Sequence, residues 1–136
     1  MHEIKIKKGY SDGTLKLSPR QTIAKNKDFI SWCIKDDGEV TSIENIEMKD
    51  GSTDIFIIPP HRNGDQWSAE IKDGLPDDTE YEYSITWNGK WGGKEYDPKI
   101  SVNPSTFNFI KLLIGIILGF LGLLSLEFLR RKSSSK

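Results

Sequence analysis

Side chains that can carry out acid–base or nucleophilic chemistry are few in this 136-residue chain and lie far apart in its sequence. The histidines are His2 and His61, and the single cysteine is Cys33. Nucleophilic catalysis needs a serine or cysteine activated by a neighbouring base, whereas His61 stands beside Arg62 in the segment PPHRNGDQW. The sequence therefore predicts a protein that is not an enzyme and that holds no cofactor and no metal ion.

The segment around His61 has two interpretations, and both stay open. Arg62 can hold an anion or the carboxylate of a partner, which makes His61 and Arg62 candidate contacts to a ligand or partner. A polar loop rich in proline and glycine is also typical of a solvated connection between strands.

Alternating apolar and polar residues dominate the first 106 residues. In 80–87, EYEYSITW, the side chains of Tyr81, Tyr83, Ile85 and Trp87 share one face, as in a half-buried strand. Asn88 and Gly89 follow at once and are the preferred pair for a two-residue hairpin turn. The run 53–58 is rich in β-branched residues and is expected to stop at Pro59 and Pro60.

Eight strands are predicted at intervals of about 8–12 residues, the spacing of a β-sandwich. They cover residues 3–7, 14–17, 29–34, 44–48, 53–58, 66–71, 80–87 and 99–102. The predicted fold is an all-β antiparallel sandwich of seven to eight strands over 1–102, followed by a short linker over 103–106 and a single C-terminal transmembrane helix.

Two stretches resemble known sandwich domains. LKLSPRQTIAKNKDFISWCIKDDG and YDPKISVNPS are similar to the opening and closing strands of cupredoxin-like and immunoglobulin-like β-sandwiches. A blue-copper site requires two histidines and a cysteine, usually with a weak axial methionine. The chain offers His2, His61, Cys33 and Met48, with the cysteine on an early strand, so the resemblance implies the fold without the copper.

A second resemblance covers residues 74–98. The stretch GLPDDTEYEYSITWNGKWGGKEYDP is similar to a run in glycogen- and starch-binding sandwich modules. It implies that Trp67, Trp87 and Trp91 stack on sugar rings. The alternation instead assigns Trp87 to the core, and Trp91, beyond the hairpin, is the candidate ligand contact or a cover for the sheet edge.

The C-terminal region differs in composition from the rest of the chain. Residues 112–126 carry no charge, and apolar residues extend this run in both directions, so a transmembrane helix is predicted over 107–129. Lys111 at one end and Arg130, Arg131 and Lys132 at the other are the expected membrane-interface anchors. The predicted partner of this segment is a lipid bilayer, and 130–136 form a basic tail.

Three glycines fall on one side of the predicted helix. Gly115, Gly119 and Gly122 have the spacing of a helix-packing stripe, and the first two form a GxxxG motif. Such a stripe favours a homo-oligomer or a partner membrane helix, although glycine is also common in membrane helices in general.

The distribution of charge along the chain constrains its binding partners and its cellular compartment. Residues 1–106 contain 14 Lys and Arg against 19 Asp and Glu, a balance that disfavours nucleic acid as a partner. The basic tail would remain in the cytoplasm by the positive-inside rule, but no signal precedes the sandwich and Cys33 is unpaired. The expectation is a single-pass, tail-anchored membrane protein whose N-terminal domain is cytoplasmic.

The sequence thus predicts a non-enzymatic, membrane-anchored recognition module for an unidentified protein or small ligand. One alternative is a membrane-disrupting or pore-forming effector triggered when a ligand clusters the sandwiches. Another alternative is an exported carbohydrate-binding or cupredoxin-like module.

Overall fold

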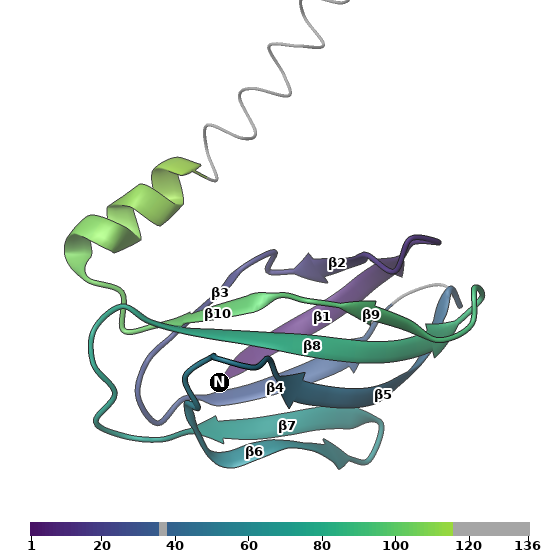
Figure 1. The fold of residues 1–136 in the computed structure, drawn as a ribbon, viewed down its shortest axis with the longest axis horizontal. Helices are drawn as coiled ribbons and strands as arrows, with labels where there is room; N and C mark the ends of the chain where they lie inside the picture. Colours follow the sequence, from purple (N-terminus) through teal and green to yellow (C-terminus); the bar gives the residue numbers. More distant parts are fainter. Residues whose placement is uncertain (36–37, 116–136) are drawn as a thin grey trace, which may run out of the picture. The chain divides into compact units, whose positions relative to one another are not determined.

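The computed structural model describes residues 1–35 and 38–115, and those up to Asn103 form two β-sheets packed as a sandwich (Figure 1). Alternating burial along the strands is the physical basis of this arrangement, since each sheet must cover one apolar face. The strands are β1 (His2–Gly9), β2 (Leu15–Ser18), β3 (Thr22–Ala24), β4 (Phe29–Ile34), β5 (Val40–Met48), β6 (Phe56–Asn63), β7 (Gln66–Ile71), β8 (Thr79–Gly89), β9 (Lys94–Tyr96) and β10 (Lys99–Val102).

Both sheets contain parallel as well as antiparallel pairs. Sheet A has the order β2-β1-β4-β7-β6, and sheet B has the order β3-β10-β8-β5, with β9 also paired to β8. The pairs β1–β4 and β3–β10 are parallel, so the prediction of a purely antiparallel sandwich is wrong. Parallel pairing arises because the chain leaves sheet A after β2, adds β3 to sheet B, and returns with β4 beside β1.

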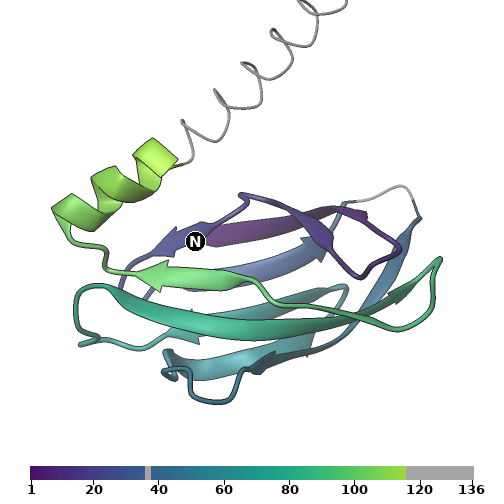
Figure 2. The ribbon, with the colours of Figure 1, turned by 45° about the horizontal axis from the view of Figure 1, so that its top comes forward.

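The core lies between the two layers, which Figure 2 shows from a second angle. As the alternation predicts, the side chains of Tyr81, Tyr83, Ile85 and Trp87 are at most 1% exposed. Trp32 of β4 faces them from sheet A, and its ring meets that of Tyr83 edge to face at 5.8 Å between centroids. The aromatic side chains therefore join the sheets.

Two of the predicted strands, 29–34 and 66–71, match β4 and β7 residue for residue. The strand predicted over 53–58 begins later, at Phe56, and continues through Pro59 and Pro60 to Asn63. Prolines are tolerated there because β6 is at the edge of sheet A, where no further strand needs their missing N–H groups.

The predicted Asn88-Gly89 turn is also wrong, because β8 continues through Gly89 and the chain reverses over 90–93. Gly92 takes the positive φ of 80° in this reversal. Gly89 stands opposite Val40 of β5, and a Cβ atom at Gly89 would overlap the carbonyl oxygen of Glu39. Position 89 therefore requires glycine, because the two backbones approach too closely for a side chain.

The compact sandwich comprises Met1–Asn103, and a second unit begins at Pro104. That unit contains a helix over 106–115, whose first turn is capped by the Ser105 hydroxyl accepting the Asn108 N–H at 3.3 Å. Ten residues rise about 15 Å, half of a hydrocarbon core of about 30 Å. In residues 1–35 and 38–115 no helix is both long and apolar enough to cross a membrane.

The predicted transmembrane helix over 107–129, and with it the predicted tail anchor, is therefore wrong as far as the structure describes the chain. The remainder of that predicted span, 116–129, lies outside the described residues.

Candidate functional site

A hollow of about 340 Å³ opens where the end of β4, the start of β5 and the β6–β7 hairpin meet. We call it the β5–β7 hollow. Its position follows from the β6–β7 turn at Gly64 and Asp65, in which Gly64 has a φ of 65° and Asn63 pairs with Gln66. The lining residues are Ile34, Thr41, Ser42, Ile43, Arg62, Gly64, Asp65, Gln66 and Trp67.

Trp67 is the largest side chain of the hollow and is held in one orientation. It is half-buried against the core, and its indole Nε1 donates a hydrogen bond to the Ile43 carbonyl oxygen at 3.3 Å. Ile43 belongs to β5 of the other sheet, so this bond links sheet B to sheet A. A half-buried indole fixed in this way presents a rigid apolar surface with little conformational entropy to lose on binding.

Arg62 stands opposite Trp67 in the β6–β7 register, and both side chains therefore lie on the same face of the hairpin. Its Nη2 donates to the same Ile43 oxygen at 3.0 Å, and its Cζ lies 5.9 Å from the centre of the Trp67 ring. Guanidinium carries five N–H donors, so one bond leaves several for a ligand. Arg62, predicted to contact a ligand or partner, also has a structural role: it hydrogen-bonds a backbone carbonyl of the edge strand β5.

Polar groups at the rim of the hollow differ in how far they are already engaged. The Thr41 hydroxyl donates to the Asn88 carbonyl oxygen at 3.1 Å, and the Ser42 hydroxyl donates to the Glu44 carboxylate. The side chains of Asp65 and Gln66 are exposed and form no hydrogen bond to another residue in the described part of the chain. Asp65 and Gln66 are therefore the groups free to bind a polar ligand.

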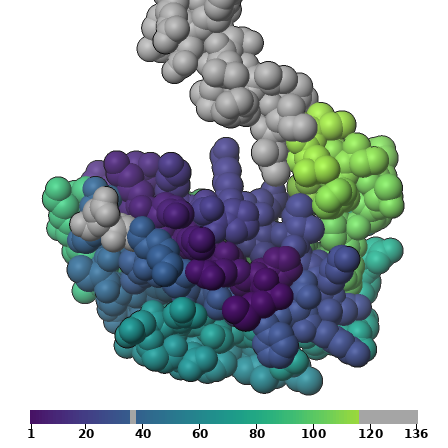
Figure 3. Space-filling view, turned by 180° about the vertical axis from the view of Figure 1, so that it is seen from behind, coloured from purple at the N-terminus to yellow at the C-terminus, as the bar shows by residue number. Residues whose placement is uncertain are grey.

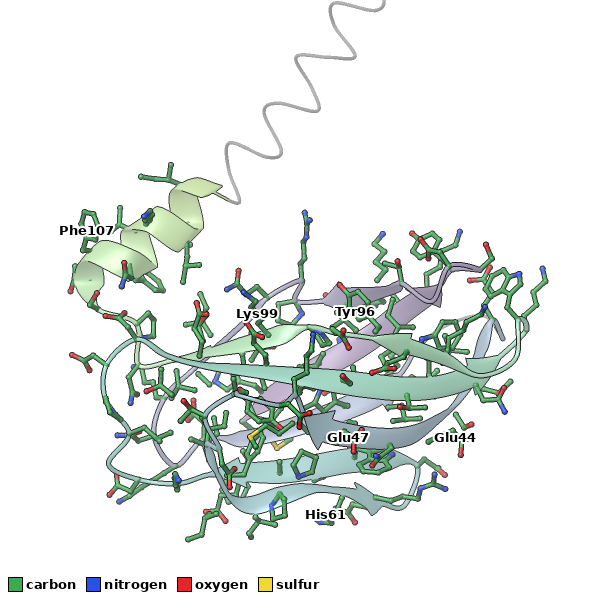
Figure 4. All side chains as sticks on the ribbon, viewed as in Figure 1. Glu44, Glu47, His61, Tyr96, Lys99 and Phe107 are labelled. Atoms are coloured by element: carbon green, nitrogen blue, oxygen red, sulfur yellow. The ribbon has the colours of Figure 1, made fainter. Side chains whose placement is uncertain are left out.

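His61 is next to Arg62 in sequence but on the opposite face of β6. It pairs with Ser68 and is exposed, away from the residues that line the hollow (Figure 4). Its Nδ1 donates to the Pro59 carbonyl oxygen at 2.9 Å, which leaves the lone pair on Nε2. The structure therefore does not bring His61 and Arg62 to one site, and both lie on a strand and not in the predicted loop.

The two other tryptophans of the predicted sugar site are engaged with the sandwich itself. Trp87 is fully buried and donates from Nε1 to the Gly13 carbonyl oxygen at 2.9 Å. Trp91 is half-buried against the core, and the Lys90 ammonium lies 5.5 Å from its ring centre. Trp91 therefore covers an edge of the core, and it is not part of the lining of the hollow.

Cys33 is buried on the outer face of sheet A, where its thiol donates to the Glu3 carboxylate at 3.0 Å. Burial, together with this hydrogen bond and the negative charge of Glu3, raises the pKa of the Cys33 thiol to about 11. A thiol with such a pKa is a poor nucleophile at neutral pH. Among residues 1–35 and 38–115, no group of three His, Cys, Asp or Glu side chains is placed to hold a metal ion.

The residues expected at the C-terminal helix are described only in part. Lys111 and Gly115 lie on the helix over 106–115, Lys111 exposed and Gly115 with open space around it. The remaining predicted positions, Gly119, Gly122, Arg130, Arg131 and Lys132, lie outside the described residues.

Comparison with known proteins adds no relative to this picture: no protein-family model matches the chain, and no curated protein matches its sequence. What the hollow can bind follows from its own geometry and chemistry.

The hollow was missed from the sequence, although part of its signal is present there. Asn63 and Gly64 between two apolar runs indicate a hairpin, and a hairpin places Arg62 opposite Trp67. The contribution of Ile43, from the other sheet, has no such local signal.

Proposed function

We propose that the sandwich is a non-catalytic recognition module that binds a glycan, with a sugar ring seated in the β5–β7 hollow against Trp67. The observation that carries this proposal is the half-buried indole, held by the Ile43 carbonyl in a hollow with free polar groups at its rim. A rigid aromatic surface beside a few fixed polar groups is the usual composition of a small-ligand site.

The chemistry of the lining favours a neutral ligand that has an apolar face and a polar edge. Arg62 and Asp65 carry opposite charges, so the hollow has no net charge from its ionisable lining residues. A sugar ring offers C–H groups to the indole and hydroxyl groups to the planar side chains of Arg62, Asp65 and Gln66. Its size also fits, because a volume of about 340 Å³ lies at the lower end of ligand pockets.

The resemblance of residues 74–98 to glycogen- and starch-binding modules supports the same class of ligand. That stretch supplies β8 and β9, whereas the proposed site uses Trp67 in place of Trp91. We also propose that the sandwich is cupredoxin-like or immunoglobulin-like, on the sequence resemblance of its opening and closing strands, and we propose no copper site.

Affinity electrophoresis of the full chain in gels containing soluble starch, glycogen, a mixed-linkage β-glucan or a xylan tests this proposal. We expect retardation by at least one polysaccharide, a loss of at least tenfold in affinity for Trp67→Ala, and unchanged retardation for Trp91→Ala. Both tryptophans are half-buried against the core, so Trp91→Ala is a matched control for lost packing.

A second variant keeps the test independent of folding. Gln66 is exposed at the rim, and Gln66→Ala is expected to weaken retardation without changing stability. The proposal is overturned if none of the four polysaccharides retards the wild-type chain, or if Trp91→Ala abolishes retardation while Trp67→Ala and Gln66→Ala leave it intact.

A further inference from the structure

The outer face of sheet A carries a cluster of lysines that the hollow does not use. Because β1 and β4 run parallel, their C-terminal ends lie side by side, and β2 pairs with the same end of β1. Lys8 stands opposite Lys16, and the Lys35 N–H donates to the Ile6 carbonyl oxygen at 2.8 Å. The cluster, which we call the lysine patch, consists of Lys5, Lys7, Lys8, Lys16 and Lys35.

In the part of the chain that the structure describes, the ammonium groups of the lysine patch form no close ion pair. No carboxylate oxygen of residues 1–35 or 38–115 lies within 4 Å of any of them. Figure 3 looks at the sandwich from behind and shows the purple N-terminal segment, which carries four of these lysines, across this side of the molecule. Glu3, on the same face of β1, interacts electrostatically with Lys5 and Lys35. The lysines outnumber this carboxylate, so the described part of the patch carries an excess of positive charge.

The outer face of sheet B has the opposite charge. Two of its carboxylates are paired, Glu82 with Lys99 at 3.5 Å and Asp97 with Lys49 at 3.2 Å. The others have no basic nitrogen within 4 Å in the part of the chain that the structure describes. These unpaired carboxylates, which we call the glutamate face, belong to Glu44, Glu47, Glu80 and Glu95; Figure 4 shows the first two on β5.

The two surfaces lie on opposite layers of the sandwich and cannot meet within one molecule. They can meet between two molecules, since each copy offers both charges. We infer that copies of this chain associate head to tail, with the lysine patch of one copy against the glutamate face of the next. Such a contact joins two different surfaces, so a lysine patch stays free at one end of the assembly and a glutamate face at the other. Further copies add to these ends, and the assembly grows into a filament unless the copies close into a ring.

A second copy is favoured over a nucleic acid as the occupant of the lysine patch. Residues 1–106 carry an excess of acidic over basic residues, and the glutamate face adds repulsion for a phosphate backbone. The patch also contains no arginine, the side chain best suited to phosphate.

The expected association is weak and depends on salt. Individual exposed ion pairs contribute little, and a Debye length of about 10 Å at 0.1 M salt falls to about 3 Å at 1 M. We expect the mass of the full chain to rise with protein concentration in about 50 mM salt and to return to the monomer value in about 1 M salt.

Sedimentation velocity with charge-reversal variants tests the inference. Lys8→Glu/Lys16→Glu reverses two of the five charges of the lysine patch, and Glu44→Lys/Glu47→Lys reverses two of the four charges of the glutamate face. We expect each double variant to be monomeric alone and the two to form a complex when mixed, because each retains intact the surface that is weakened in the other. Lys25→Glu, in the β3–β4 turn, reverses one lysine outside both surfaces and is expected to associate like the wild type.

Several results would overturn the inference. One is a wild-type chain that stays monomeric at every concentration in low salt. The inference is overturned in the same way if this monomer binds a DNA oligonucleotide through the lysine patch. Another is self-association that persists in 1 M salt or in both reversal variants, which would assign the contact to another part of the chain. Failure of the mixed variants to associate would equally refute it.

Discussion

Replacing Tyr83 with phenylalanine removes one buried hydrogen bond and leaves the packing of the aromatic core almost unchanged. The indole Nε1 of Trp32, on sheet A, donates to the Tyr83 hydroxyl, on sheet B, at 3.1 Å, and both side chains are at most 1% exposed. In Tyr83→Phe the ring stays and the acceptor is lost, so the Trp32 N–H is buried without a partner. An orphaned buried donor costs about 1–3 kcal/mol, a large part of a total stability of about 5–15 kcal/mol.

Urea denaturation of the full chain, followed by tryptophan fluorescence, measures this cost. Tyr81→Phe is the matched control: Tyr81 is also about 1% exposed, stacks on Tyr83 at 5.3 Å, and its hydroxyl has no hydrogen-bond partner among the described residues. We expect Tyr83→Phe to lower the free energy of unfolding by about 1–3 kcal/mol and Tyr81→Phe to change it by about 0.5 kcal/mol or less. Equal effects of the two variants would refute the assignment of this hydrogen bond as a link between the sheets.

Three further predictions concern backbone approach, thiol reactivity and acid stability. Gly89→Ala places a methyl group against the backbone of β5 and should lower the melting temperature markedly, whereas Gly93→Ala, with open space around it, should be nearly neutral; similar shifts would contradict the close approach. Burial raises the pKa of Cys33 from 9.0 to about 11, so iodoacetamide at pH 8 should alkylate Cys33 about 100-fold more slowly than a free cysteine. The alkylation rate should still be rising at pH 10, and a rate that reaches its plateau below pH 9 would contradict the buried environment. The Ser84 hydroxyl donates a hydrogen bond to Asp97 at 2.7 Å and lowers the pKa of Asp97 below its ordinary 3.8. Ionised Asp97 therefore stabilises the fold above pH 3.8, and this contribution is lost as the pH falls through the lowered pKa. The urea midpoints at pH 5 and pH 3 should differ less in Asp97→Asn than in the wild type, and an unchanged difference would contradict this role of Asp97.

Much of the strand pattern could be predicted because burial on one face imposes a period of two on the sequence. This signal is strong in β7 and β8, where apolar and polar residues alternate over six or more positions. It is absent from β3 and β9, which have three residues each and were missed. Composition alone also misjudged the C-terminal helix, which covers ten residues where the structure describes it.

The candidate site was less predictable than the strands. Arg62 was identified from its charge and its neighbours, but as part of a loop with His61, whereas β6 turns the two side chains to opposite faces. Trp67 was assigned to a strand face and, through the resemblance of residues 74–98 to glycogen- and starch-binding modules, to sugar stacking. Neither assignment indicated that one end of that strand is open. Both side chains are oriented by the Ile43 carbonyl oxygen, and hydrogen bonds between residues 19 and 24 positions apart leave no local pattern.

The sequence by itself determined where most of the longer strands lie and which of their faces is apolar, because both depend on neighbours within a few positions. The tertiary structure alone decided the parallel pairs β1–β4 and β3–β10, the hollow beneath Trp67, and the separation of lysines and glutamates onto opposite layers. These features arise from contacts between strands far apart in the chain, where loop closure and packing select one pairing among many that the same alternation permits.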